Sequence, residues 1–203
     1  MNIREYGVLF WTVVGVLALL VASPVLSRVL VYPRTEFFTE LWILDANRKA
    51  ENYPFNITRN QNHSVFLGIG NRLGYCAYYV VQVKFRNQTQ PAPTSFGPIE
   101  ERVPSSLPSL FNVSAFVADE QVLELPLTFS LNYSYNDVLS RIEFYSLTLN
   151  NVLLNLTDCT ATWDSGRNEF MGNLFFEAWI YNATVGDFQY HERFVSLRLN
   201  MTL

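Results

Sequence analysis

Charged residues are scarce in this sequence, and lysine is almost absent. Charged side chains make up 16% of the 203 residues, and only Lys49 and Lys84 of the 14 basic residues are lysine. The net charge is -4, and no basic run occurs anywhere in the chain. A protein that binds nucleic acid neutralises phosphates with clustered Lys and Arg side chains. We therefore expect no nucleic-acid partner.

Residues that carry enzymatic chemistry are also rare. The only two histidines are His63 and His191, and no G-x-S-x-G, H-E-x-x-H or P-loop motif occurs. His63 lies within an Asn-His-Ser triplet, where a solvent-facing position is the simpler interpretation. His191 lies near Asp187 and Glu192, which could form an acid-base cluster, although a polar hairpin turn explains the same residues. We predict no enzyme activity, no catalytic residue and no cofactor.

Metal and sugar sites have only weak candidates. Asp158, Asp164 and Glu169 could bind calcium, but their spacing matches no calcium loop, so we interpret them as part of a solvated loop. Trp179 in "NLFFEAWIY" could stack on a sugar ring. Most aromatic residues of that stretch share a strand face with Glu177 and are more simply core. We expect no metal site.

Cysteine occurs only twice, at Cys76 and Cys159, with no C-x-x-C motif. Outside the cell, a single pair of cysteines is usually bridged. We therefore predict a disulfide between Cys76 and Cys159, with two unpaired buried thiols as the alternative.

One long hydrophobic run is present near the N-terminus. The stretch from Gly7 to Leu26 contains no charged residue. A helix of this length spans roughly 30 Å, the thickness of a bilayer core. Aromatic residues flank the stretch, with Tyr6 on one side and Tyr32 on the other, as at a membrane interface. We predict that residues 1–31 form a retained membrane anchor, and the alternative is a signal peptide cleaved after Ser27.

Glycosylation acceptor motifs follow this run. Asn-x-Ser/Thr occurs eight times, never with proline in the middle, and far more often than residue frequencies would produce by chance. The motifs place residues 32–203 outside the cytoplasm, although the arginines near the anchor favour the opposite orientation. We predict a single-pass protein with a cytoplasmic N-terminus, an extracellular C-terminal domain and N-linked glycans. The acceptors are Asn56, Asn62, Asn87, Asn112, Asn132, Asn155, Asn182 and Asn200.

The remaining sequence has a period of two. In "YCAYYVVQVKF" the apolar residues alternate with Gln82 and Lys84, and "QVLELPLTFSL" alternates in the same way, with Pro126 on its polar face. Both stretches indicate half-buried antiparallel strands, and Pro126 suggests an edge strand. A proline-rich insertion at about 88–110 indicates a surface loop or a linker. We predict an Ig-like antiparallel β-sandwich with further strands at 36–44, 64–70, 112–117, 141–150, 173–181 and 193–202.

Several phrases of the sequence resemble a known family. They are "TEFFTELWILDANRKAENYPFNIT", "HSVFLGIGNRLGYCAYYVVQVKF" and "FFEAWIYNATVGDFQYHERFVSLRLNMT". They are similar to the DUF1616 family, archaeal membrane proteins of unknown function, over most of residues 35–86 and 121–202. The resemblance implies an extracytoplasmic Ig-like domain on a membrane segment in an archaeal cell envelope. Many relatives carry several membrane segments where this chain has one, and the family supplies no catalytic residues.

These observations predict a non-enzymatic archaeal cell-envelope protein whose ectodomain has a structural or interaction role. Its expected partners are membrane lipid and other envelope or membrane proteins. One alternative is a secreted surface-filament or surface-layer-associated subunit assembled by strand pairing. Another is a glycan-binding or glycan-processing protein that uses residues 175–192. The low charge also predicts that solubility and stability persist near pH 3.

Overall fold

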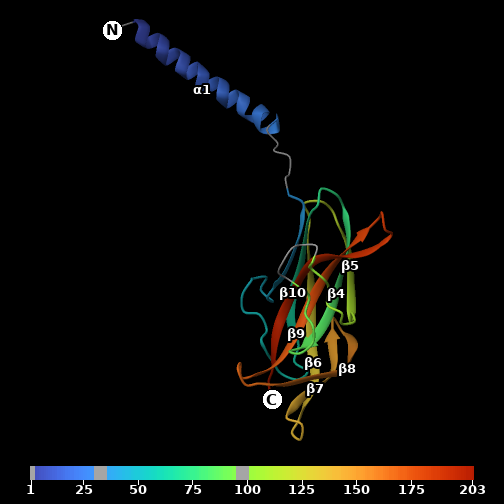
Figure 1. The fold of residues 1–203 in the computed structure, drawn as a ribbon. Helices are drawn as coiled ribbons and strands as arrows, with labels where there is room; N and C mark the ends of the chain where they lie inside the picture. The colour runs from blue at the N-terminus through green and yellow to red at the C-terminus, as the bar shows by residue number, and fades with distance from the viewer. Residues whose placement is uncertain (1–2, 30–35, 95–100) are drawn as a thin grey trace. The chain divides into compact units, whose positions relative to one another are not determined.

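A computed structural model of the chain describes residues 3–29, 36–94 and 101–203. The chain divides into two compact units, Met1–Phe37 and Phe38–Leu203 (Figure 1). Among the residues that the structure describes, the first contains the helix α1, Ile3–Val29, and the second contains ten strands. The prediction of a mostly β protein that begins with one apolar helix is therefore confirmed.

Helix α1 is apolar through its central part. Its stretch from Tyr6 to Pro24 is long and apolar enough to cross a membrane, and none of this stretch is buried inside the protein. The Thr12 hydroxyl donates to the Val8 carbonyl at 2.9 Å, so this polar group is satisfied within the helix itself, as an apolar surrounding requires. Tyr32, predicted to flank the membrane segment, lies outside the described residues.

The ten strands include all eight that the alternation predicts. The two that it misses are β2, which has only two residues, and β8, in which the alternation is interrupted between Leu156 and Cys159. The strands are β1 Phe38–Leu44, β2 Asn56–Ile57, β3 His63–Arg72, β4 Ala77–Asn87, β5 Phe111–Val117, β6 Val122–Asn136, β7 Arg141–Leu149, β8 Val152–Asp164, β9 Glu169–Asn182 and β10 Asp187–Met201.

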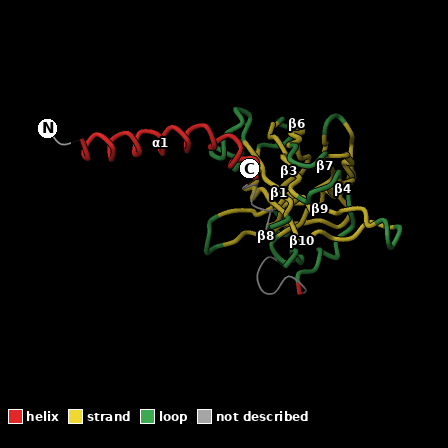
Figure 2. The backbone as a smooth tube through the Cα atoms, turned by 90° about the horizontal axis from the view of Figure 1, so that it is seen from above, coloured by secondary structure: helices red, strands yellow, loops and turns green. Residues whose placement is uncertain are grey.

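The strands form one curled, open sheet. Its order is β1-β3-β6-β7-β8-β9-β10-β2, while β4 pairs with β9 and β5. We call β1, β3, β6, β7 and β8 half A, and β5, β4, β9, β10 and β2 half B. The halves are continuous through the β8–β9 hairpin, where only Trp163 and Asp164 pair with Phe170 and Glu169. The sheet curls so that the two halves pack against each other (Figures 1 and 2).

The hydrophobic core lies between the two halves. Tyr79, Val81 and Val83 of β4 are fully buried, as the period of two predicts. Across the core, the ring of Phe85 in β4 meets the ring of Phe144 in β7 edge-on, with centroids 5.0 Å apart. Apolar burial on both inner faces therefore fixes the side to which each strand turns and its register.

Pro126 occupies a local edge within an interior strand. Strand β6 pairs with β3 over Val122–Phe129 and with β7 over Phe129–Asn136. The part that contains Pro126 therefore has a strand neighbour on one side only. On the other side the Pro126 carbonyl accepts a hydrogen bond from the Asn150 side chain at 3.2 Å. The missing N–H of proline is tolerated for this reason, although β6 as a whole is not an edge strand.

The proline-rich segment covers the outer face of half B. There the Lys84 Nζ atom lies 2.7 Å from the Glu177 carboxylate, and the two side chains are only 4% and 0% exposed. Ser105 binds both groups, because its carbonyl accepts from Lys84 at 2.8 Å and its N–H donates to Glu177 at 2.7 Å. Lys84, predicted to face solvent with Gln82, is therefore buried. Residues 95–100 of the segment lie outside the described residues.

Candidate functional site: an apolar groove at the open seam

The curled sheet does not close where β1 meets β10. Strand β1 pairs only with β3, and β10 pairs with β9 along its length but with β2 only at Asn200 and Met201. Within the part of the chain that the structure describes, no backbone hydrogen bond joins β1 to β10. The two strands nevertheless lie close together. We call this junction the seam, and it leaves backbone groups of two strands unpaired by any neighbouring strand.

An apolar groove of about 640 Å³ opens at the seam. The Tyr53 hydroxyl donates to the Ile43 carbonyl at 2.7 Å and so fastens the loop after β1 to the free edge of β1. The Trp42 ring covers Gly68 of β3, where any Cβ would overlap the indole. The groove is lined by Leu41, Trp42, Ile43, Leu44, Ala50, Tyr53, Pro54, Phe55, Val195, Ser196, Leu197 and Arg198.

The wall of the groove formed by the loop after β1 is held by Asp45. Its carboxylate accepts hydrogen bonds from the backbone N–H groups of Lys49 at 2.7 Å and Asn47 at 2.9 Å. The hydrogen bond from Lys49 is the main reason why the pKa of Asp45 lies below its ordinary value. The loop is therefore ordered by its own hydrogen bonds before any partner binds.

The chemistry of the groove suits binding of an apolar segment. Arg198 is its one charged side chain, and Arg198 is paired with the buried carboxylate of Glu169. No cluster of three His, Cys, Asp or Glu side chains that could hold a metal ion occurs among the described residues. An extended peptide binds where unpaired strand edges can pair with its backbone and an apolar groove can hold its side chains. The seam offers both features.

A buried chain of hydrogen bonds joins the halves beside the seam. Thr39 Oγ1 lies 2.7 Å from His191 Nε2 and 2.8 Å from the Tyr79 hydroxyl, which donates to Asn71 Oδ1 at 3.3 Å. All three hydrogens are satisfied when His191 Nε2–H donates to Thr39, Thr39 to Tyr79 and Tyr79 to Asn71. His191 therefore makes a structural hydrogen bond at the β10 bulge and does not lie in the predicted hairpin turn.

We expect the stability of the full chain to fall as the pH drops below about 6.5. The pKa of His191 is lowered from its ordinary value of 6.5, first by burial and then by the charge of Arg193. As the pH falls, the unfolded chain therefore binds a proton at His191 before the folded chain does. The contribution of neutral His191 to folding stability is fully present above the unfolded pKa of 6.5 and is lost as the pH falls through the lower pKa of the folded chain. This effect opposes the acid tolerance that the low charge predicts.

The measurement is the melting temperature from about pH 8 to about pH 5, the range in which a histidine titrates. His191→Gln is expected to flatten the decrease. His63→Gln is the matched control, because burial also lowers the pKa of His63. This substitution should remove only the part of the pH dependence that His63 causes and leave the part caused by His191. Identical pH profiles for His191→Gln and the unaltered chain would show that His191 is not the cause.

The predicted glycosylation acceptors differ in exposure. Asn56, Asn62, Asn112 and Asn155 are exposed. Asn132, Asn182 and Asn200 are partly exposed.

Asn87 is buried, and its side-chain nitrogen donates to the Thr160 carbonyl at 2.6 Å. A glycan on that nitrogen would crowd this hydrogen bond between β4 and β8 and would require space that packed side chains fill. We therefore expect Asn87 to stay unmodified.

Strand β10 turns its apolar face to the core and its polar face outward. Leu197, Leu199 and Met201 of β10 are buried, while Ser196 and Arg198 are exposed.

Asn200 lies on the same face, but its side chain is occupied. Its nitrogen donates to Asn56 Oδ1 at 3.0 Å, and its oxygen accepts from the Phe170 N–H at 3.1 Å. Asn56 is thus the better acceptor of this adjacent pair.

The predicted disulfide between Cys76 and Cys159 is not formed. Both are free, with Cys76 exposed just before β4 and Cys159 buried in β8. Asn87, at the far end of β4, contacts the residue after Cys159, and the 11 residues of β4 span about 35 Å. Cys76 is therefore at the wrong end of β4 to reach Cys159. Burial raises the pKa of Cys159 to about 11, so its thiol is unreactive at neutral pH.

The remaining sequence candidates are structural. Trp179 is partly buried against the ring of Tyr190, with centroids 5.7 Å apart, and is not an open sugar platform. Asp164 accepts from the Gly166 N–H at 2.9 Å in the β8–β9 turn. Glu169 is buried against Arg198 instead of joining Asp164 and Asp158. The groove itself has no sequence signal, because its two walls are 150 residues apart and alternate like any other strands.

Comparisons with known proteins add little to this picture. No protein-family model matches the chain, and no curated protein sequence matches it. One similar solved structure is that of the human seminal-plasma complex of zinc α2-glycoprotein with prolactin-inducible protein, at 7% identity and a TM-score of 0.37, covering 84% of this chain and 100% of that chain. Another is a β-glucosidase from Listeria innocua with glucose, at 11% identity and a TM-score of 0.35, covering 84% of this chain and 17% of that chain.

Proposed function

We propose that this chain is a single-pass, non-enzymatic protein of an archaeal cell envelope, with a glycosylated interaction domain outside the cytoplasm. The observation that carries this proposal is the uncharged stretch Tyr6–Pro24, which nothing in the protein buries, followed by a β domain. Seven of the eight acceptor asparagines of that domain are at least partly exposed. Lipid is the natural cover for the helix, and the extracytoplasmic space is where such acceptors are modified.

The ectodomain is proposed to be an Ig-like module of the kind that the DUF1616 resemblance implies. Two β layers that face each other across an alternating apolar core support this assignment. The seam groove is proposed to bind an extended apolar segment of another envelope or membrane protein. Its preformed loop and its unpaired strand edges support an interaction role.

The test is expression of the full chain in an archaeal host, followed by membrane fractionation, N-terminal sequencing and mass analysis of glycopeptides. We expect a membrane-bound protein that begins at or near Met1 and carries glycans at the exposed acceptors Asn56, Asn62, Asn112 and Asn155. Asn87→Gln is the matched control and should leave the glycan mass unchanged. A chain without glycan at any acceptor would remove the main support for the topology.

A second candidate is a secreted filament or surface-layer subunit assembled by strand pairing. The free edges of β1 and β10 at the seam favour it, because a strand from a neighbouring copy could pair there. The same experiment distinguishes the two. A soluble mature chain that begins at Arg28 would favour the secreted subunit over the anchored protein.

A further inference from the structure

Four aromatic rings form a row across half B. Tyr78 of β4 pairs in register with Phe116 of β5, and Tyr181 of β9 pairs with Phe188 of β10. The ring centroids of Tyr78 and Phe116 are 4.2 Å apart, those of Tyr78 and Phe188 are 5.1 Å apart, and those of Tyr181 and Phe188 are 5.4 Å apart. The four rings come from adjacent strands and therefore make one continuous surface, which we call the aromatic row.

Two of the four rings are exposed, while Tyr78 and Phe188 are partly buried between them. Phe116 is 73% exposed and Tyr181 is 42% exposed. Tyr75 and Val185 flank the row and are also exposed. A shallow cavity of about 470 Å³ beside the row is lined by Tyr75, Tyr78, Phe116 and Tyr181, among others. Large apolar side chains gathered on an exposed face mark an interaction surface.

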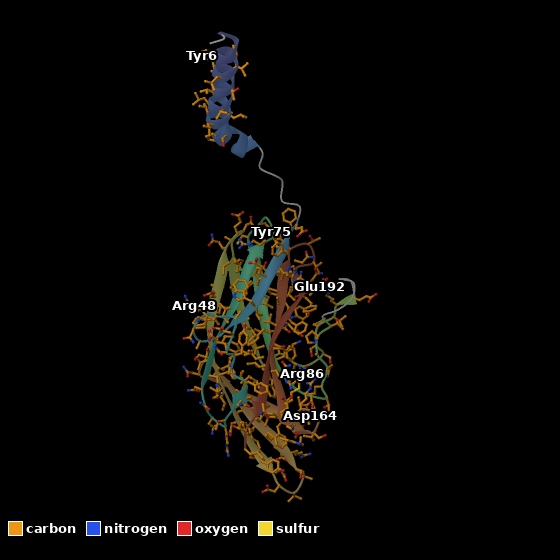
Figure 3. All side chains as sticks on the ribbon, turned by 90° about the vertical axis from the view of Figure 1, so that its left-hand side faces the viewer. Tyr6, Arg48, Tyr75, Arg86, Asp164 and Glu192 are labelled. Carbon is orange, nitrogen blue, oxygen red and sulfur yellow. The ribbon has the colours of Figure 1, made fainter. Side chains whose placement is uncertain are left out.

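The aromatic row lies at the end of the β unit where β1 begins. Phe38, the first residue of β1, pairs with Arg72 at the end of β3, and β4 starts five residues later at Ala77. Figure 3 shows Tyr75 at this end of the unit. The β9–β10 hairpin, which carries Tyr181 and Phe188, turns at the same end, because Ile180 pairs with Tyr79.

The chain itself limits how far this end can be from the helix. Helix α1 ends at Val29 and β1 begins at Phe38, so eight residues join them. Even fully extended, eight residues span only about 30 Å. If α1 crosses a membrane, as proposed above, the length of the connection allows the lipid headgroups to lie within reach of the aromatic row. Tyrosine rings are suited to that layer because one end is apolar and the hydroxyl meets water, and phenylalanine rings add apolar surface that can be buried there.

A sugar fits the aromatic row less well than lipid does. Sugar recognition requires several free hydrogen-bonding groups beside the stacking ring. The two amide side chains at the rim, Asn182 and Gln189, bind each other at 2.8 Å, and the Asn182 oxygen accepts from the Thr184 N–H at 2.9 Å. The surface that remains is apolar, with the tyrosine hydroxyls as its polar tips.

We propose that the aromatic row, together with Tyr75 and Val185, inserts into the headgroup layer of the membrane that α1 crosses. This docking rests on the proposed function, because it requires a retained anchor. It also makes Asn182 an acceptor that stays unmodified, since a glycan at the hairpin would hold the aromatic row away from lipid. Glycan on most copies at Asn182 would therefore overturn the docking.

The native thiol of Cys76 reports on this surface. Cys76 is exposed and lies in the same cavity wall, whereas Cys159 is buried. The full chain, labelled at Cys76 with a fluorophore, is reconstituted into diphytanyl phosphatidylcholine vesicles that contain a lipid with a nitroxide on its headgroup. The control label is placed at Val138→Cys in a Cys76→Ser background, because Val138 is 91% exposed in the turn at the opposite end of β6.

We expect the nitroxide lipid to quench the Cys76 label at least threefold more than the label at position 138. Phe116→Ser combined with Tyr181→Ser should bring the two labels to equal quenching, while Leu153→Ser, an exposed apolar residue of half A, should change nothing. Flotation with the vesicles is measured in parallel. A chain that floats but shows equal quenching of both labels overturns the docking and leaves the anchor intact. A chain that does not float overturns both the docking and the proposed function.

Discussion

Lys84→Met is expected to destabilise the β unit by about 3–5 kcal/mol, because it leaves a buried carboxylate without its cation. Glu177 is 0% exposed, and with Lys84 removed its carboxylate would keep the hydrogen bond from the Ser105 N–H but have no cation beside it. The melting temperature of the full chain in detergent should fall by roughly 6–20 °C. Ser105 would also lose the Lys84 donor to its carbonyl. We therefore expect limited proteolysis to cut the proline-rich segment faster.

Two controls separate this effect from a general loss of charge. Arg141→Met breaks a partly exposed ion pair with Glu143, for which about 1 kcal/mol or less is expected. Lys84→Met combined with Glu177→Leu removes both buried charges and should recover much of the stability. If Lys84→Met cost no more than Arg141→Met, the buried pair would not hold the segment on half B.

Alternation of side chains predicted most of the fold, because each of the eight predicted strands turns apolar residues to the core between the halves. It placed Lys84 in solvent because the proline-rich segment that covers Lys84 has no periodic pattern of its own. It missed β8 for a related reason. In β8, the buried residues Leu156, Cys159 and Ala161 are not evenly spaced, since the pairing with β7 shifts register between Phe144 and Ser146.

The candidate sites were less predictable, because they depend on which strands become neighbours. A local motif marks Asn87 as an acceptor, yet its burial follows from contact with Thr160, 73 residues away. The cysteine pair failed similarly, since composition says nothing about which end of β4 lies beside β8. The aromatic row arises from one residue on each of four strands, so the sequence shows only single aromatics. Motifs therefore identified residue types, and the sheet order decided which of them meet.

Phe85→Ala is expected to destabilise the β unit by about 3–5 kcal/mol, the usual range for removing a buried ring. Phe85 is 6% exposed and belongs to half B, and its ring contacts Phe144 of half A edge-on. Its loss opens a cavity between the halves that the neighbouring strands cannot fill without moving. Thermal unfolding of the full chain measures the effect, and Phe85→Leu should cost less because it retains part of the volume.

Gly172 provides a direct test of how closely Phe85 is packed. A Cβ at Gly172 would lie 2.7 Å from the Phe85 ring and 2.7 Å from Met201, so Gly172→Ala alone should be destabilising. In a Phe85→Leu background the added methyl group meets a shorter side chain, and its cost should fall by about 0.5–3 kcal/mol, the range for residues in contact. Ile69→Ala, in β3 at the end of the unit where β1 begins, is the matched background in which the cost of Gly172→Ala should stay unchanged. Equal costs in the Phe85→Leu and Ile69→Ala backgrounds would contradict the close packing of Phe85 on Gly172. A reduced cost in Phe85→Leu alone would show that the absence of a side chain at position 172 is what lets Phe85 reach across to half A.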